Sequence, residues 1–151
     1  MIAAASLTAR MSAGGANAQG LPQVHRLPAA LAMQAVTEAV ESCARQGYAE
    51  TAVVVDADGV RQAVLRGDRT GGHTLDSAFD NAYTAATFKS DTTALVERAK
   101  TAPGFTALFT QLPHLILLGG GIVIKLGDET IGAGGAPGAH AGLDKIRDQI
   151  R

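Results

Sequence analysis

Hydrophobic positions recur with two different periods along the first half of the chain. Residues 29–46 repeat apolar side chains every three or four positions, as one face of a helix does, and Gly47 follows as a natural C-cap. Residues 51–55 are β-branched and apolar. After the Asp56–Gly59 turn, residues 60–66 form a second strand pattern, in which one face carries Val60, Gln62, Val64 and Arg66 and the other carries Arg61, Ala63 and Leu65. The pattern predicts a helix followed by a β-hairpin.

The second half repeats this order on a larger scale. Helical patterns are expected over three segments, residues 74–88, 91–100 and 105–109. Two strands follow at residues 122–126 and 130–133, joined by a short turn that contains Gly127 and Asp128. A final amphipathic helix has an apolar stripe that consists of Leu143, Ile146 and Ile150.

The order of these elements is helix, hairpin, helices, hairpin, helix. Tight turns make the paired strands antiparallel, and the regular β-α-β alternation of a parallel sheet is missing. We therefore predict an α+β fold, a profilin-like antiparallel sheet of two hairpins flanked by helices. The length of 151 residues suits one domain, which we place at residues 21–151.

The N-terminal residues 1–20 do not belong to this pattern. They are rich in small residues, contain no acidic residue and include Ala16-Asn17-Ala18, which resembles a signal-peptide cleavage site. We interpret them as the remnant of a signal peptide or as a disordered arm. The first interpretation predicts a periplasmic or secreted protein, and the second a cytoplasmic one.

Composition and charge narrow the classes of partner. The 13 basic and 14 acidic residues give a net charge of -1, so no basic surface is available for a nucleic acid. No apolar run reaches the roughly 20 residues that a membrane span needs. The single cysteine, Cys43, excludes an internal disulfide and a cysteine-cluster metal site, and its place in the first helical stripe predicts a buried thiol.

Four segments in a fixed order resemble one known family. They are the first helix with residues 53–59, the segment 76–88 with its core Ala-Tyr-Thr-Ala-Ala, the glycine-rich segment 119–132, and the Gly-Gly-Ala-Pro-Gly segment 134–138 with the Ala-Gly-Leu that follows. Together they resemble the GlcG/HbpS family of haem-binding and haem-degrading proteins. The resemblance covers nearly everything after residue 27.

The chain departs from that family in two places. Asn81 stands where the family usually carries a lysine, just before the Ala-Tyr pair. An acidic stretch that commonly separates the Ala-Pro-Gly loop from the last helix is missing, because Gly138 is followed directly by Ala139, His140 and Ala141. A function that rests on those carboxylates is not predicted here.

The resemblance implies a profilin-like fold, a homo-oligomer that is often an octamer, and a tetrapyrrole ligand, haem. An imidazole is the common protein ligand of haem iron, and His73, between Gly71-Gly72 and a helix start, is the best candidate for both cofactor and metal binding. The alternative is a histidine that only caps the helix. His140 is a second candidate, whereas His25 and His114 are interpreted as ordinary surface residues.

Other candidate cofactor contacts come from two segments. Tyr83 and Thr84 offer hydroxyl groups within an alanine-rich helix, or are simply half-buried there. Gly135, Ala136 and Gly138 precede the last helix, where backbone N–H groups can hold an anion such as a haem propionate. The alternative is a tight strand-to-helix turn.

Two functions are consistent with these residues. The leading hypothesis is a haem-binding protein with slow oxidative haem degradation. The alternative is a non-catalytic, oligomeric accessory module that binds a small organic acid in a catabolic pathway. No nucleophile–base motif and no dinucleotide fingerprint is present, so the sequence leaves open whether the protein is an enzyme.

Overall fold

The computed structural model describes residue 20 and residues 23–150. The predicted signal-peptide remnant or arm, residues 1–20, lies outside the described part except for Gly20. The described residues form five helices and four strands, in this order: α1 (Ala29–Arg45), β1 (Thr51–Asp56), β2 (Arg61–Arg66), α2 (Thr74–Phe88), α3 (Thr92–Ala99), α4 (Pro103–Gln111), β3 (Gly121–Leu126), β4 (Glu129–Gly135) and α5 (Ala139–Arg147).

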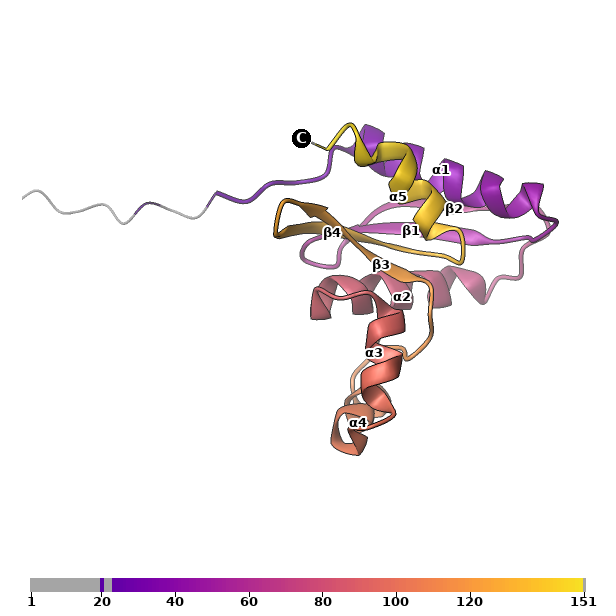
Figure 1. The fold of residues 1–151 in the computed structure, drawn as a ribbon. Helices are drawn as coiled ribbons and strands as arrows, with labels where there is room; N and C mark the ends of the chain where they lie inside the picture. Colours follow the sequence, from indigo (N-terminus) through magenta and orange to yellow (C-terminus); the bar gives the residue numbers. More distant parts are fainter. Residues whose placement is uncertain (1–19, 21–22, 151) are drawn as a thin grey trace, which may run out of the picture.

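The four strands form one antiparallel sheet in the order β2-β1-β4-β3. The two predicted hairpins join along β1 and β4, where Val54 pairs with Gly134. α1 and α5 cover one face of the sheet, and α2 covers the other (Figure 1). The arrangement confirms the predicted α+β fold.

The structure moves two boundaries of the predicted elements. β4 continues through Gly134 and Gly135, which the sequence placed in a loop, because both residues pair with β1 and β3. α4 begins at Pro103 and is longer than the single turn that was expected. A proline at the first helical position costs no hydrogen bond, since that N–H has no partner within the helix.

Each face of the sheet has its own apolar core. Between the sheet and the helices α1 and α5 lie aliphatic side chains such as Val36, Val54, Ile124 and Ile146. Against α2 lies a smaller cluster that is dominated by alanines. The small side chains of α2 let this helix approach the sheet closely, and the positions opposite it on β4 are small as well.

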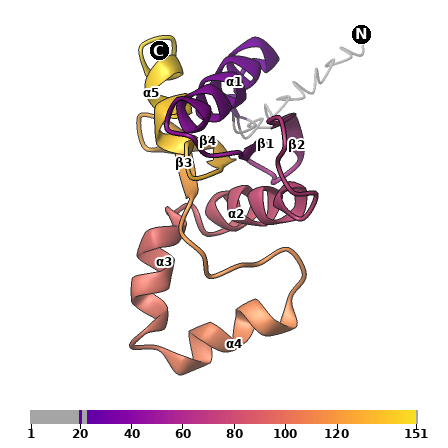
Figure 2. The ribbon, with the colours of Figure 1, turned by 90° about the vertical axis from the view of Figure 1, so that its right-hand side faces the viewer.

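α3 and α4 form an arm that extends away from the sheet on the α2 side (Figure 2). Three rings connect the end of α2 to α4. Phe88 of α2 stacks on Phe109 of α4 with ring centroids 5.4 Å apart, and Phe105 meets both rings edge-on. The Arg98 guanidinium lies 4.4 Å from the centroid of the Phe105 ring. The chain then returns from the arm to β3 through residues 112–120.

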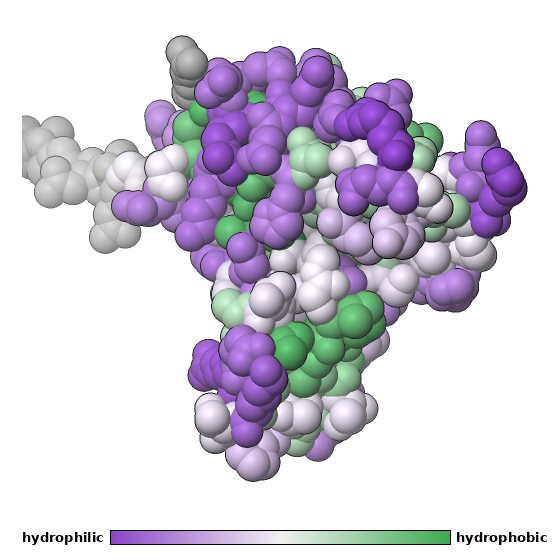
Figure 3. Space-filling model, turned by 45° about the vertical axis from the view of Figure 1, so that its right-hand side comes forward, coloured by the Kyte–Doolittle hydropathy of each residue, from purple (hydrophilic) through white to green (hydrophobic). Residues whose placement is uncertain are grey.

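The arm carries apolar side chains that no other described residue buries. α4 has no buried residue, and Leu108 is 41% exposed. Leu112 and Leu118, in the return segment, are exposed as well. Figure 3 shows this apolar area, in green, over the lower part of the molecule.

Candidate functional site

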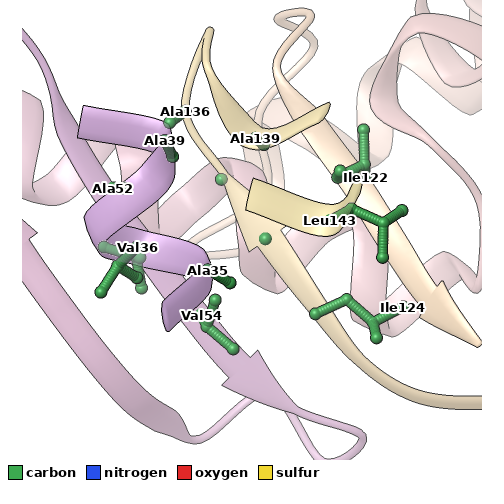
Figure 4. A pocket seen from close by; sticks show the side chains of 13 residues that line it. Ala35, Val36, Ala39, Ala52, Val54, Ile122, Ile124, Ala136, Ala139 and Leu143 are labelled. Carbon is green, nitrogen blue, oxygen red and sulfur yellow. The ribbon is translucent and has the colours of Figure 1, made fainter. Parts of the chain in front are cut away.

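The cavity between α1, α5 and the sheet is not a ligand site. Its volume is about 10 Å³, and its wall is apolar, with Val36, Val54, Ile122 and Ile124 among the side chains (Figure 4). A space of this size holds at most one water molecule, and an apolar wall offers that water no hydrogen bond. It is therefore a gap in the packing of the core.

A second hollow, of about 210 Å³, opens to solvent on the opposite side of the sheet, at the first turns of α2. It is formed by the start of β1, one side of α2, the end of the return segment and the turn between β4 and α5. The residues that line it are Glu50, Thr51, His73, Thr74, Ser77, Ala78, Asn81, Leu118, Gly119, Ala136 and Pro137. We refer to this hollow as the α2 pocket.

The exposed ring of His73 lies at the rim of the α2 pocket. His73 is the residue before α2, and its side chain makes no capping hydrogen bond to the helix. The helix start is fixed by its neighbour instead: the Thr74 hydroxyl is 2.7 Å from the Thr51 hydroxyl and donates to the Gly71 carbonyl at 2.7 Å. The His73 imidazole thus lies beside a fixed helix end and forms no capping hydrogen bond with it.

The pocket combines apolar walls with one carboxyl group. Ala136, Pro137 and Leu118 supply apolar surface, while Glu50 lies at the edge. Burial raises the pKa of the Glu50 carboxyl, and the hydrogen bond from the Thr51 backbone N–H opposes this effect. The described lining residues include no lysine or arginine. The pocket is therefore poorly suited to bind a small anion.

Cys43 lies near the same end of the molecule, below the β4–α5 turn. Cys43 is 5% exposed, which confirms the predicted burial. Burial raises the pKa of the Cys43 thiol, the charge of Glu50 raises it further, and the Gly138 backbone N–H lowers it. A thiol in this state is a poor nucleophile and a poor metal ligand.

Asn81, the position where the resembling family usually has lysine, lines the α2 pocket from α2. It is 5% exposed, and its amide oxygen accepts a hydrogen bond from the Thr92 hydroxyl at 3.4 Å. The Thr92 hydroxyl in turn accepts from the Gly121 N–H at 2.9 Å. Asn81 therefore joins the pocket wall to the start of α3 and to β3.

Of the predicted site residues, the structure brings His73 and Ala136 together in the α2 pocket. Gly135 and Gly138 are buried in close contact with backbone: a Cβ on Gly135 would lie 2.7 Å from the Ala82 nitrogen, and one on Gly138 would collide with the Ala39 carbonyl oxygen. His140 is exposed on α5, outside the pocket lining. The roles predicted for these residues stay predictions.

Tyr83 and Thr84 lie away from the α2 pocket. The Tyr83 ring packs against the β1–β2 turn, where a Cβ on Gly59 would meet it at 2.7 Å. Thr84 is 0% exposed, and its hydroxyl accepts from the Ile116 N–H at 3.0 Å and donates to the His114 carbonyl at 3.4 Å. Thr84 thus attaches the return segment to α2.

Glu50 and Asn81 line the α2 pocket but were not among the residues predicted from the sequence to contact a cofactor. A helical spacing was available for Asn81: Thr74, Ser77, Ala78 and Asn81 share one side of α2, and all four line the pocket. For Glu50 no such pattern exists, because it lies in the connection between α1 and β1 and becomes part of the pocket only through the fold.

Within residue 20 and residues 23–150, no group of three or more His, Cys, Asp or Glu side chains is arranged to hold a metal ion. Over the same part of the chain, no helix is both long and apolar enough to cross a membrane.

The fold and the α2 pocket define a class: a small α+β protein with a sheet between helices, and an open pocket with a histidine at its rim. The family is given by the sequence match, since the model of the family described as "Haem degrading protein HbpS-like" matches residues 27–146. The chain belongs to this HbpS-like family. No curated protein matches the sequence significantly.

Solved structures agree with this assignment. A double mutant of Streptomyces reticuli HbpS is 29% identical, with 95% of this chain and 97% of that chain covered and a TM-score of 0.74. The Klebsiella pneumoniae protein ORFY is 25% identical, with 84% and 94% covered and a TM-score of 0.72. A PduOC:heme complex, 22% identical, with 83% and 94% covered and a TM-score of 0.70, shares the fold.

Proposed function

We propose that the protein binds haem and that the α2 pocket takes one edge of the macrocycle. The observation that carries the proposal is the imidazole of His73, exposed at the rim of a largely apolar pocket. Membership in the HbpS-like family supports a tetrapyrrole as the ligand. Pro137, Ala136 and Leu118 would contact the flat face or edge of the ring system, and His73 would be the iron ligand.

The lining residues of the α2 pocket are chemically suited to haem, but the pocket is large enough for only part of the macrocycle. An imidazole among apolar side chains is a common environment for haem iron. The volume of about 210 Å³ is below the roughly 300–1,000 Å³ of pockets that enclose a whole ligand. With no cation among the described lining residues, the propionates would face solvent, away from Glu50.

Slow oxidative breakdown of haem is the second part of the proposal. Bound haem iron would supply the oxygen chemistry, and the protein would supply the pocket and the ligand. In this chain, Glu50 is the residue able to hold or release a proton at the pocket edge, because burial raises the pKa of its carboxyl. Thr51 and Thr74 keep the helix end in place beside it.

A small organic acid is the alternative ligand, and the pocket argues against it. A pocket of about 210 Å³ has room for such a molecule. However, a bound carboxylate would face Glu50 without a lysine or arginine in the described lining to neutralise it. Asn81, in place of a lysine, contributes an amide where a positive charge would be needed.

Hemin titration is expected to give a saturable Soret shift with the wild-type protein. In His73→Ala, binding at the α2 pocket is expected to weaken at least about tenfold, or about 1.4 kcal/mol, because the iron loses its protein ligand. Absorbance titration at fixed protein concentration measures both. His140→Ala is the matched control, since His140 is exposed but lies outside the pocket lining.

Three outcomes of this titration are informative. An absent Soret shift in the wild type would refute haem binding. An equal loss in His140→Ala would show that the loss is not specific to His73, and would remove the α2 pocket from the proposal. A thermal shift of the wild type with small carboxylic acids, and none with hemin, would favour the accessory-module alternative.

We further propose that the protein is a homo-oligomer that uses the arm. α4 has nine residues and no buried side chain, although Phe105 and Phe109 pack against Phe88. A helix this short depends on tertiary contacts for its stability in water. The exposed Leu108 and Leu112 belong to the surface that another copy would cover. Homo-oligomers are the common way for a folded chain to bury such a surface.

Light scattering at micromolar concentration is expected to show an assembly of several chains. Leu108→Glu is expected to shift the protein to smaller species, because it places a charge on the apolar surface of α4. Thr110→Glu is the control, since Thr110 is exposed on the same helix and offers no large apolar side chain. A monomeric wild-type protein would contradict the proposal.

A further inference from the structure

The ring of His73 differs from two other histidine rings in what it contacts. Nδ1 of His25 lies 2.6 Å from a carboxylate oxygen of Glu129, and Nδ1 of His114 lies 3.0 Å from one of Asp80. For the ring of His73, no hydrogen bond is found within the part of the chain that the structure describes. The orientation of this ring therefore depends on the backbone that it packs against.

That backbone belongs to Gly71, two residues earlier in the chain. A Cβ on Gly71 would lie 2.7 Å from Cε1 of His73 and 2.8 Å from its Nδ1, but 3.9 Å from Nε2. The two shorter distances are well below ordinary van der Waals contact between heavy atoms. The missing side chain at position 71 thus makes room for the imidazole, whose Nδ1 edge lies against the loop while Nε2 is farther from it.

The conformation of the loop does not itself require glycine at position 71. Neither Gly71 nor Gly72 has a positive φ, so the backbone at both positions is open to alanine. At Gly71 the three atoms nearest to an added Cβ are all ring atoms of His73, whereas at Gly72 no atom lies within 4 Å. Space for the imidazole is therefore what distinguishes Gly71 from its neighbour.

The backbone of Gly71 is held in place from both sides. Its carbonyl accepts hydrogen bonds from the Thr74 N–H at 3.1 Å and from the Thr74 hydroxyl at 2.7 Å. The same hydroxyl is 2.7 Å from the hydroxyl of Thr51, a buried residue of β1. On the other side Thr70, which is 2% exposed, donates its hydroxyl to the Glu50 carbonyl at 3.2 Å. The surface on which the ring rests is thus fixed to the sheet.

This placement of the ring affects which nitrogen is accessible to a flat ligand. The iron of a haem lies at the centre of the macrocycle, so the nitrogen that binds it needs open space on every side. Nδ1 has the backbone of residue 71 beside it, and Nε2 does not. In a neutral imidazole one nitrogen carries the proton and the other the lone pair. Coordination through Nε2 leaves the proton on Nδ1, next to the loop.

From these contacts we infer that Gly71 is a positioning residue of the α2 pocket, which orients the His73 ring so that Nε2 ligates the iron. The inference rests on the proposed haem binding and assigns a role to a residue that does not touch the ligand. Gly71 acts only through the imidazole. A ring that already has its bound orientation loses less side-chain freedom when the ligand arrives, which favours binding.

Hemin titration of Gly71→Ala tests the inference. This variant is expected to bind hemin about tenfold more weakly, because its Cβ displaces the ring from the orientation that the iron needs. The iron–histidine stretching band in the resonance Raman spectrum of the ferrous complex is expected to shift as well. Gly72→Ala is the matched control, since it adds the same methyl group where no atom lies within 4 Å, and it is expected to keep the affinity and the spectrum of the wild type.

A double variant shows whether Gly71 acts through His73. Gly71→Ala combined with His73→Ala is expected to bind hemin as weakly as His73→Ala alone, because no ring is left to displace. Circular dichroism checks that each variant is folded. A further loss in the double variant, or equal losses in Gly71→Ala and Gly72→Ala, would overturn the inference.

Two more outcomes separate this inference from the proposed function. Wild-type affinity and an unshifted stretching band in Gly71→Ala would overturn the role of Gly71 and leave haem binding by His73 intact. No hemin binding by the wild type would refute both.

Discussion

Gly135→Ala is expected to lower the free energy of unfolding by about 3 kcal/mol, because no space exists for a methyl group at this position. A Cβ on Gly135 would lie closer than 3.0 Å to the Ala78 carbonyl oxygen and 2.7 Å from the Ala82 nitrogen. Both are backbone atoms of α2, so the whole helix would have to move away from the sheet. Urea denaturation, followed by circular dichroism, measures the change.

Gly134→Ala is the matched control, since it adds the same group to the neighbouring residue of β4. There the nearest atom is the Ala139 Cβ at 3.7 Å, which is ordinary van der Waals contact. A change within about 1 kcal/mol of the wild type is expected. If the two variants were equally stable, the close approach of α2 to β4 would not exist in solution.

The close contact between Gly135 and α2 explains why the prediction of a loop at Gly135 was wrong. A run of glycines before a helix indicates a loop when only local preference is considered. In the protein, Gly134 and Gly135 pair with strands on both sides, and the absent side chain at Gly135 makes room for α2. The architecture itself was predictable, because periodicity and turns locate the hairpins and helices. Distances between elements were not, because they depend on pairs of residues far apart in the sequence.

Individual histidines also differ in whether a local pattern or only a long-range contact reveals their surroundings. His73 was identifiable because it stands beside glycines at a helix start, where few other roles compete for its ring. His114 was interpreted as an ordinary surface residue, because its partner Asp80 is 34 positions away and the return segment that joins them has no periodic pattern. A carboxylate–histidine pair of this kind becomes visible only when the tertiary structure brings the two side chains together.

Ile146→Ala is expected to destabilise the protein by about 3 kcal/mol, through loss of buried apolar surface and the cavity that remains. The sequence predicted an apolar stripe of Leu143, Ile146 and Ile150 on the last helix. The structure separates its members, because Ile146 is 0% exposed within the core between α1, α5 and the sheet, whereas Leu143 and Ile150 are partly buried. Ile146 is thus the principal anchor of α5.

Ile150→Ala provides the comparison, with the same chemical change at a partly buried position beyond the end of the helix. It is expected to cost about 1 kcal/mol, because less surface is lost and solvent fills the space. Equal effects of the two substitutions in urea denaturation would mean that α5 does not dock as described. Since α5 starts two residues after Pro137 in the wall of the α2 pocket, undocking it would also loosen that wall. Weaker hemin binding by Ile146→Ala, with His73 unchanged, would link the packing of α5 to the pocket.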